Sequence, residues 1–290
     1  MTFRENANIG GGRASRGGGG GRGGGGLAVG GGIGTLLIAL VIMLFGGDPG
    51  AVLGGGQQAP TTSAENVDLA ECQTGADANA DVDCRMKGGM ASLEQYWSQA
   101  YPKAPVPRAI LFTGAVNTQC GQATSQVGPF YCPLDEQIYL DTAFFNQLEG
   151  QLGAQGGNLG ELYVLGHEYG HHVQNYTGAL QASQQDRQGA ESGAVRVELQ
   201  ADCFAGAWIS NASGPQGLLE PPTKEDISSA LSAAAAVGDD SIQEKMTGQV
   251  DPHSWTHGSS EERMGWFMRG YDSGDPNQCD TLNAASVDDY

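Results

Sequence analysis

The stretch that most constrains this chain is His167-Glu168-Tyr169-Gly170-His171. In a helix, residues four apart lie one turn apart on the same face, so the imidazoles of His167 and His171 can converge on one point. Imidazole nitrogens held in this way are suitable ligands for zinc. Glu168 can then reach a zinc-bound water without becoming a ligand, which is the logic of the H-E-x-x-H motif. The stretch therefore predicts a catalytic zinc site on a helix.

The residues around this stretch predict a helix of roughly five turns. Asn158 with Glu161 three residues later has the form of a capping box, and Gly178 has the form of a C-cap. Apolar residues between the cap and the motif supply buried surface: Leu159, Leu162, Val164 and Leu165. The alternative is a buried helix with two structural histidines. Because the chain has only five histidines and two of them have the ligand spacing, we favour the zinc site.

A catalytic zinc usually takes three protein ligands, so a third ligand is expected. Glu198 is the best candidate, in a second apolar helix predicted from about residue 190 to residue 210. Asp202 lies one turn further on and can accept from the free N–H of a ligating histidine. Two solvated surface carboxylates are the alternative, but most flanking residues are apolar, and an unpaired buried carboxylate is costly. Asp202, or another acid, stays open as an alternative third ligand.

These residues belong to two longer motifs, and further motifs lie elsewhere in the chain. They occupy residues 166–174, 198–206, 128–133 with 138–141, and 256–260 with 270–276. Together they resemble the bacterial family described as putative neutral zinc metallopeptidases, over roughly residues 70 to 285. The resemblance implies an α+β fold with a zincin-like metallopeptidase domain, mainly helical with a small sheet, attached to a membrane. It also implies His167, His171 and Glu198 as Zn²⁺ ligands and Glu168 as the base.

A zinc peptidase also needs a donor for the oxyanion of its tetrahedral intermediate. His257 is our candidate, because it lies just before a predicted helix and within the family-like pattern 256–258. A loop histidine that is structural or exposed is the alternative. His172 and His253 receive no role.

The N-terminal region differs from the rest in composition. Residues 1–26 combine four Arg with an excess of Gly and have no apolar face, which predicts a disordered cytoplasmic tail; nucleic-acid contact is the alternative. Residues 27–46 are uncharged and predict one transmembrane helix as an anchor, with a cleaved signal peptide as the alternative. Residues 47–67 predict a linker. The positive tail would place the domain, residues 68–290, outside the membrane of a single-pass protein.

Charge and cysteine content describe the domain further. Beyond residue 46 the chain keeps all its acids except Glu5, so this part is more acidic than the overall net charge of −19. Such a charge argues against nucleic-acid binding by the domain. An even number of cysteines in an exported domain predicts disulfides, and the absence of a C-x-x-C pair disfavours zinc–thiolate ligation. Of the many possible connectivities we predict Cys72–Cys84, Cys120–Cys132 and Cys203–Cys279.

These features predict a zinc-dependent endopeptidase that acts on a peptide or protein substrate, with Glu168 activating the zinc-bound water. One alternative is a membrane-tethered zinc-binding or assembly protein without proteolytic turnover. Another is a disulfide-stapled adhesive ectodomain without zinc. The resemblance also implies that the strand at 139–141 pairs with extended substrate; the alternative is that Ile138 and Leu140 are core residues and Tyr139 lies on the surface. The sequence does not specify the substrate, the cleavage preference or the oligomeric state.

Overall fold

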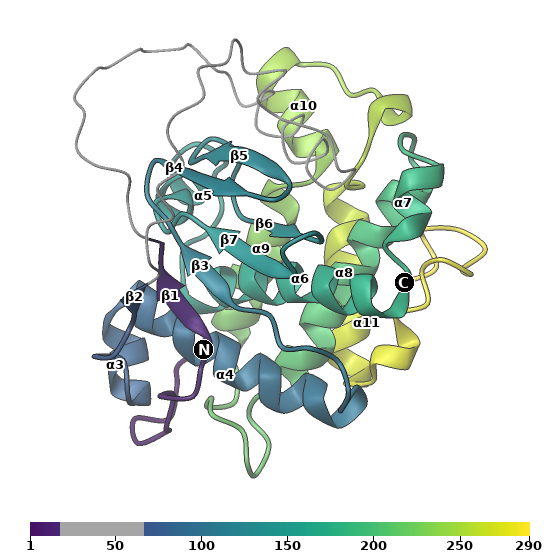
Figure 1. Cartoon of the computed structure of the whole chain (residues 1–290). Coiled ribbons are helices and arrows are strands. Elements are labelled where there is room, and N and C mark those ends of the chain that lie inside the picture. The colour runs from purple at the N-terminus through teal and green to yellow at the C-terminus, as the bar shows by residue number, and fades with distance from the viewer. Residues whose placement is uncertain (18–66) are drawn as a thin grey trace, which may run out of the picture.

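The computed structural model describes residues 1–17 and 67–290, an α+β fold in which about half of the described residues are helical (Figure 1). The helices are α3 (Gly75–Ala80), α4 (Val82–Ala100), α5 (Phe144–Gly150), α6 (Asn158–Thr177), α7 (Gln181–Gln185), α8 (Gly193–Asn211), α9 (Lys224–Ala236), α10 (Asp239–Thr247) and α11 (Ser260–Ser273), with 3-10 turns η1 (Pro252–Ser254) and η2 (Pro276–Gln278). The strands are β1 (Ala14–Arg16), β2 (Val67–Asp68), β3 (Ala109–Leu111), β4 (Ala115–Thr118), β5 (Gly121–Thr124), β6 (Phe130–Cys132) and β7 (Gln137–Leu140).

The main sheet has the strand order β2-β1-β3-β7-β6, and β4 and β5 form a separate antiparallel pair. Strands β1, β3 and β7 are parallel, whereas β2 and β6 run antiparallel to their neighbours. Alternate residues point to opposite faces, as expected for strands. Leu111 and Leu140 pack in the large core with the helices, whereas Ile110 and Tyr139 pack in a smaller core with residues of the β4–β5 region.

The position of β7 overturns one prediction. Because β7 pairs with β3 on one side and β6 on the other, its backbone has no free edge for an extended substrate. Among the described strands, β2 and β6 are the two edges of this sheet, and β6 contacts α6. The strand predicted at 139–141 to bind substrate is therefore a core strand.

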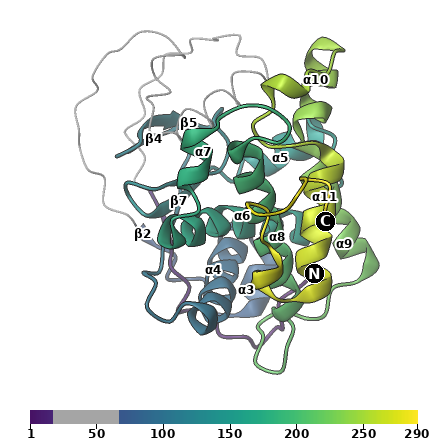
Figure 2. The same cartoon turned by 90° about the vertical axis from the view of Figure 1, so that its right-hand side faces the viewer.

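Helix α8 contacts both α6 and α11, and these three helices form the centre of the helical layer (Figure 2). The crossing of α8 and α11 depends on two glycines. A Cβ on Gly206 would lie 2.0 Å from the Phe267 carbonyl oxygen, and one on Gly270 would lie 1.9 Å from the Cys203 carbonyl oxygen. Side chains at these positions would force the helices apart, so the glycines bring residues of α11 within reach of α8.

Helix α6 has the predicted length but a different start. Its N-cap is Gly157, at φ 141°, and Asn158 is already the first helical residue. The predicted capping box does not form, because Glu161 instead accepts from the Arg85 guanidinium at 2.8 Å. Gly178 ends the helix in the left-handed conformation, as predicted.

Residues 1–17 are part of the fold, so the prediction of a disordered tail is wrong for them. Strand β1 lies between β2 and β3 in the sheet, and both Phe3 and Ile9 are buried. Glycine serves close packing here, since a Cβ on Gly12 would lie 2.0 Å from the Lys87 carbonyl oxygen. The Gly-rich composition predicted disorder, and β1, with three residues, is too short to show an alternating pattern that would have predicted a strand.

The pairing of β1 also bears on the predicted membrane topology. Strand β1 pairs with β2 and β3, so the structure has residues 14–16 in one sheet with the domain, whereas the predicted topology has them on opposite sides of a membrane. Within 1–17 and 67–290, no helix combines the length and the apolar character needed to cross a bilayer. The predicted anchor, residues 27–46, and nearly all of the predicted linker lie outside the described residues.

The disulfides are those predicted: Cys72–Cys84, Cys120–Cys132 and Cys203–Cys279. The first two close short loops. The third joins α8 to the C-terminal segment after η2. None of the six cysteines is free to bind a metal.

Candidate metal centre

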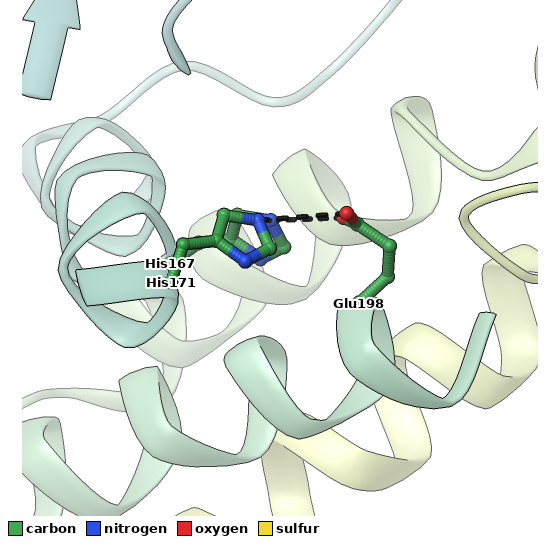
Figure 3. Close-up of side chains that lie close together, drawn as sticks. All are labelled: His167, His171 and Glu198. Atoms are coloured by element: carbon green, nitrogen blue, oxygen red, sulfur yellow. Dashed lines mark hydrogen bonds and ion pairs between the residues drawn. The ribbon is translucent and has the colours of Figure 1, made fainter. Parts of the chain in front are cut away.

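Three buried side chains from α6 and α8 converge on one point (Figure 3). His167 Nε2 lies 3.1 Å from Glu198 Oε2 and 3.1 Å from His171 Nε2, and His171 Nε2 lies 3.5 Å from Glu198 Oε1. A tetrahedral zinc with bonds of about 2.0–2.1 Å holds its ligand atoms about 3.3 Å apart. The structure therefore brings together the predicted set of His167, His171 and Glu198 at the spacing of a zinc site.

The hydrogen bonds made by the Nδ1 atoms of His167 and His171 indicate which charge is favoured at the point where the three side chains meet. His167 Nδ1 lies 2.8 Å from Asp202 Oδ1, and His171 Nδ1 lies 2.8 Å from the amide oxygen of Gln174, whose nitrogen donates elsewhere. Both Nδ1 atoms therefore donate, and in the neutral rings both Nε2 atoms present lone pairs. Two lone pairs and the Glu198 carboxylate then face one another, an arrangement that a positive charge between them stabilises. A zinc ion supplies this charge and can be coordinated by both Nε2 atoms and the Glu198 carboxylate.

Asp202 lies behind His167, where the sequence placed it, and it belongs to a larger network. It accepts from the Tyr163 hydroxyl at 2.5 Å and from Arg263 Nε and Nη2 at 2.9 and 3.0 Å. Burial alone would raise the pKa of Asp202, but Arg263 and then His167 hold it below its usual value. The network fixes the ring of His167 and keeps Asp202 charged.

Glu168 lines the cavity next to this centre and is 5% exposed. Its carboxylate accepts from the backbone amide of Tyr131 on β6, and Oε2 has no hydrogen-bond partner among the described residues. Burial raises the pKa of Glu168 to about 7. A carboxylate with such a pKa can both take up and release a proton near neutral pH.

His257 lines the same cavity and is 2% exposed, just before α11 as predicted. Its Nδ1 lies 2.9 Å from the Thr256 hydroxyl and 3.5 Å from Asp239 Oδ1, whereas Nε2 is buried without a partner in the described parts of the chain. Burial alone would lower the pKa of His257, but the carboxylates of Glu198 and Asp239 raise it. The ring can therefore present a donor to the cavity.

Asp239 holds the loop that carries His257, and sequence reasoning missed it. Its Oδ2 accepts from the backbone amides of Thr256, His257 and Gly258 at 2.7, 2.7 and 3.2 Å. No local spacing connects Asp239 to this loop. Gln174 and Arg263 were missed as well, although Gln174 follows His171 by three residues, which is a helical-neighbour spacing.

The two histidines without a predicted role lie away from the metal centre. His172 Nε2 donates to the Pro105 carbonyl at 2.8 Å, so its Nδ1 accepts from the Tyr131 hydroxyl at 3.1 Å. This histidine ties β6 to α6. His253 is exposed in η1.

A histidine pair one helical turn apart, a glutamate beside the first histidine and a third carboxylate on a second helix form the arrangement that is typical of zinc metallopeptidase sites. The chain belongs to the family described as "Putative neutral zinc metallopeptidase", whose model matches residues 1–282. The match includes residues 1–17, in agreement with their place in the sheet.

Two relatives resemble the chain over most of its length. It is 49% identical over 249 residues to Uncharacterized protein Rv2575 of Mycobacterium tuberculosis, covering 82% of this chain and 84% of the relative. It is 42% identical over 202 residues to Uncharacterized protein YpfJ of Escherichia coli K12, covering 67% and 69%. No solved structure matches the chain.

Proposed function

We propose that this protein is a zinc-dependent endopeptidase. The observation that carries the proposal is Glu168, a buried carboxylate beside the metal ligands with one oxygen free of hydrogen bonds among the described residues. A structural zinc site needs four ligands and has no use for such a base. Three protein donors leave a coordination position for water, as in catalytic sites.

The chemistry follows from the positions of the side chains. His167, His171 and Glu198 would hold the zinc, which when bound would lower the pKa of a water molecule and polarise the scissile carbonyl. Glu168 takes a proton from a water molecule through its free oxygen while the water oxygen adds to the scissile carbonyl carbon, and it returns the proton to the nitrogen as the C–N bond breaks. His257, held by Asp239, donates from Nε2 to the oxyanion that forms at the carbonyl.

The three disulfides support a location in an oxidising compartment outside the cytoplasm. Because β1 is part of the sheet, we propose that residues 1–17 and 67–290 lie there together.

Replacing Glu168 by Gln tests the function directly. The variant should keep zinc at the parental stoichiometry and lose roughly 10²–10⁴-fold in cleavage of a denatured protein substrate, because the base is gone. A zymogram with parallel metal analysis measures both, and the exposed Glu149→Gln serves as the control. Parental cleavage by the Glu168 variant would disprove its role, and a parent that cleaves nothing when loaded with zinc would favour a binding or assembly protein.

Replacing Glu198 by Ala tests the metal ligands. Two imidazoles alone bind zinc weakly, so the purified variant should contain far less zinc than the parent after dialysis against a weak chelator. Atomic absorption measures the content, with the exposed Glu220→Ala as the matched control. Unchanged zinc content would reject Glu198 as a ligand.

A further inference from the structure

The cavity beside the metal centre has one polar end and an apolar remainder. His167, Glu168, Glu198 and His257 form the polar end. The remainder is lined by apolar side chains from six separate segments: Val127, Phe144, Leu152, Val164, Val237 and Ile242. Five of these six are buried, so the wall belongs to the folded core and is preformed.

The size of the cavity limits what can enter it. Its volume is about 90 Å³. A cavity of roughly 150 Å³ lined by similar residues accepts a benzene ring, so this one suits an aliphatic side chain better than a bicyclic indole. Filling it would bury apolar surface at about 25 cal/mol per Å².

The charges around the cavity oppose a charged occupant. Arg263, the cationic side chain in the lining, is already committed to Asp202 and Tyr163. Glu168 and Glu198 lie at the end where the reaction takes place, not along the apolar wall. A carboxylate or ammonium in the apolar part would therefore be desolvated without a partner.

We propose that this cavity is the specificity pocket of the enzyme and takes an aliphatic side chain, of the size of Leu, Ile or Met, from a residue next to the scissile bond. The inference rests on the proposed function, because the metal ligands and Glu168 form one end of the pocket. It adds the substrate class: peptides with an aliphatic residue beside the cleaved bond, in preference to acidic, basic or Trp residues.

Hydroxamates with one variable side chain test the pocket without requiring turnover. An isobutyl, a carboxymethyl, an aminobutyl and an indolylmethyl hydroxamate share the metal-binding group, so differences in their affinity for the zinc-loaded protein report on the side chain. Calorimetry should give the isobutyl compound at least tenfold tighter binding than each of the others, since one methylene in an apolar pocket already changes affinity by about tenfold or more. Equal affinities would overturn the proposal.

Enlarging the pocket tests which residues form it. Leu152→Ala should bring the affinity of the indolylmethyl compound up to or above that of the isobutyl compound. Leu148→Ala is the matched control, because Leu148 is equally buried nearby but does not line the cavity. Ile242→Val, a smaller change, should weaken isobutyl binding several-fold in a protein that stays folded. If Leu152→Ala keeps the parental order of affinities and Ile242→Val binds the isobutyl compound as tightly as the parent, the assignment is wrong.

Mapping cleavage sites in a denatured proteome separates the pocket from the function. Cleavage with Leu, Ile or Met enriched at one position flanking the bond supports both proposals. Cleavage without enrichment overturns the pocket alone. Discrimination among the hydroxamates without any cleavage supports the pocket and contradicts the peptidase function.

Discussion

The helix pair α6–α8 and the strand β1 differ in how their partners are spaced along the chain. The histidines of the metal centre are one helical turn apart, whereas Arg16 of β1 pairs with Val67 of β2 and Leu111 of β3. A spacing of one helical turn can be recognised in a sequence, but the register between strands that are distant in the sequence cannot. The difference teaches that local spacing locates the chemistry, while long-range pairing decides which residues belong to the domain.

Substitutions in the helix pair and in the N-terminal segment test this difference between α6–α8 and β1. The largest effect on stability and zinc affinity is expected at Asp202. Asp202→Ala leaves the buried Arg263 without its partner, so the free energy of unfolding should fall by about 3–5 kcal/mol. Zinc affinity should also fall by roughly 10–100-fold, because His167 loses its orienting acceptor. Urea unfolding with and without zinc measures both. The exposed Asp272→Ala is the control, and a loss of stability with unchanged zinc affinity would limit Asp202 to a structural role.

A smaller effect is expected in the N-terminal segment, at Phe3. Its ring packs against α4 at Gly88, and its backbone exchanges hydrogen bonds with the Asn79 side chain. Phe3→Ala should lower the free energy of unfolding by about 3 kcal/mol and leave zinc stoichiometry unchanged. The exposed Thr2→Ala should change neither. If Phe3→Ala has no effect on unfolding, the segment is not part of the domain, and the topology with the tail across a membrane becomes tenable again.

The smallest effect is expected at Asp239, as a dependence on pH. Burial alone would raise the pKa of this carboxyl, but hydrogen bonds from His257 and from backbone amides lower it. The folded pKa is therefore below the unfolded pKa, so the carboxylate stabilises the fold above the unfolded value and this contribution is lost as the pH falls through the folded value. Asp239→Asn should cost about 1–2 kcal/mol at neutral pH and less near pH 3.

Urea unfolding as a function of pH measures the difference between this variant and the parent. Asp272→Asn, on an exposed part of α11, should follow the parental profile. A constant difference between Asp239→Asn and the parent across the range would contradict the role of the charge.

Much of the metal centre could be predicted because its residues lie on two helices with regular spacing. His167 and His171 share a face, and Asp202 follows Glu198 by one turn, so the helical period gives two of the three relationships. The third, the meeting of α6 with α8, depends on packing, and only the apolar character of both helices pointed to it. The disulfides were predictable for two short loops, and the third followed by elimination.

The rest of the site depends on contacts that no period encodes. Arg263 and Asp239 reach the centre from other helices, and their partners are distant in the sequence. The start of α6 was misassigned because Glu161 has a stronger partner in Arg85 than in the helix terminus. The residues of β7 are equally consistent with an apolar strand at the edge or in the middle of a sheet, so its position between β3 and β6 could be seen only in the structure.

The late position of Arg263 and of the Cys203–Cys279 bond has a consequence for biosynthesis. A growing chain contains both motif histidines and Glu198 well before it contains the Arg263 guanidinium that neutralises Asp202 or His257, the proposed oxyanion donor. The proposed catalytic residues are all in place only when the last helix docks, so under the proposed function an unfinished copy would be poorly equipped to cut its neighbours.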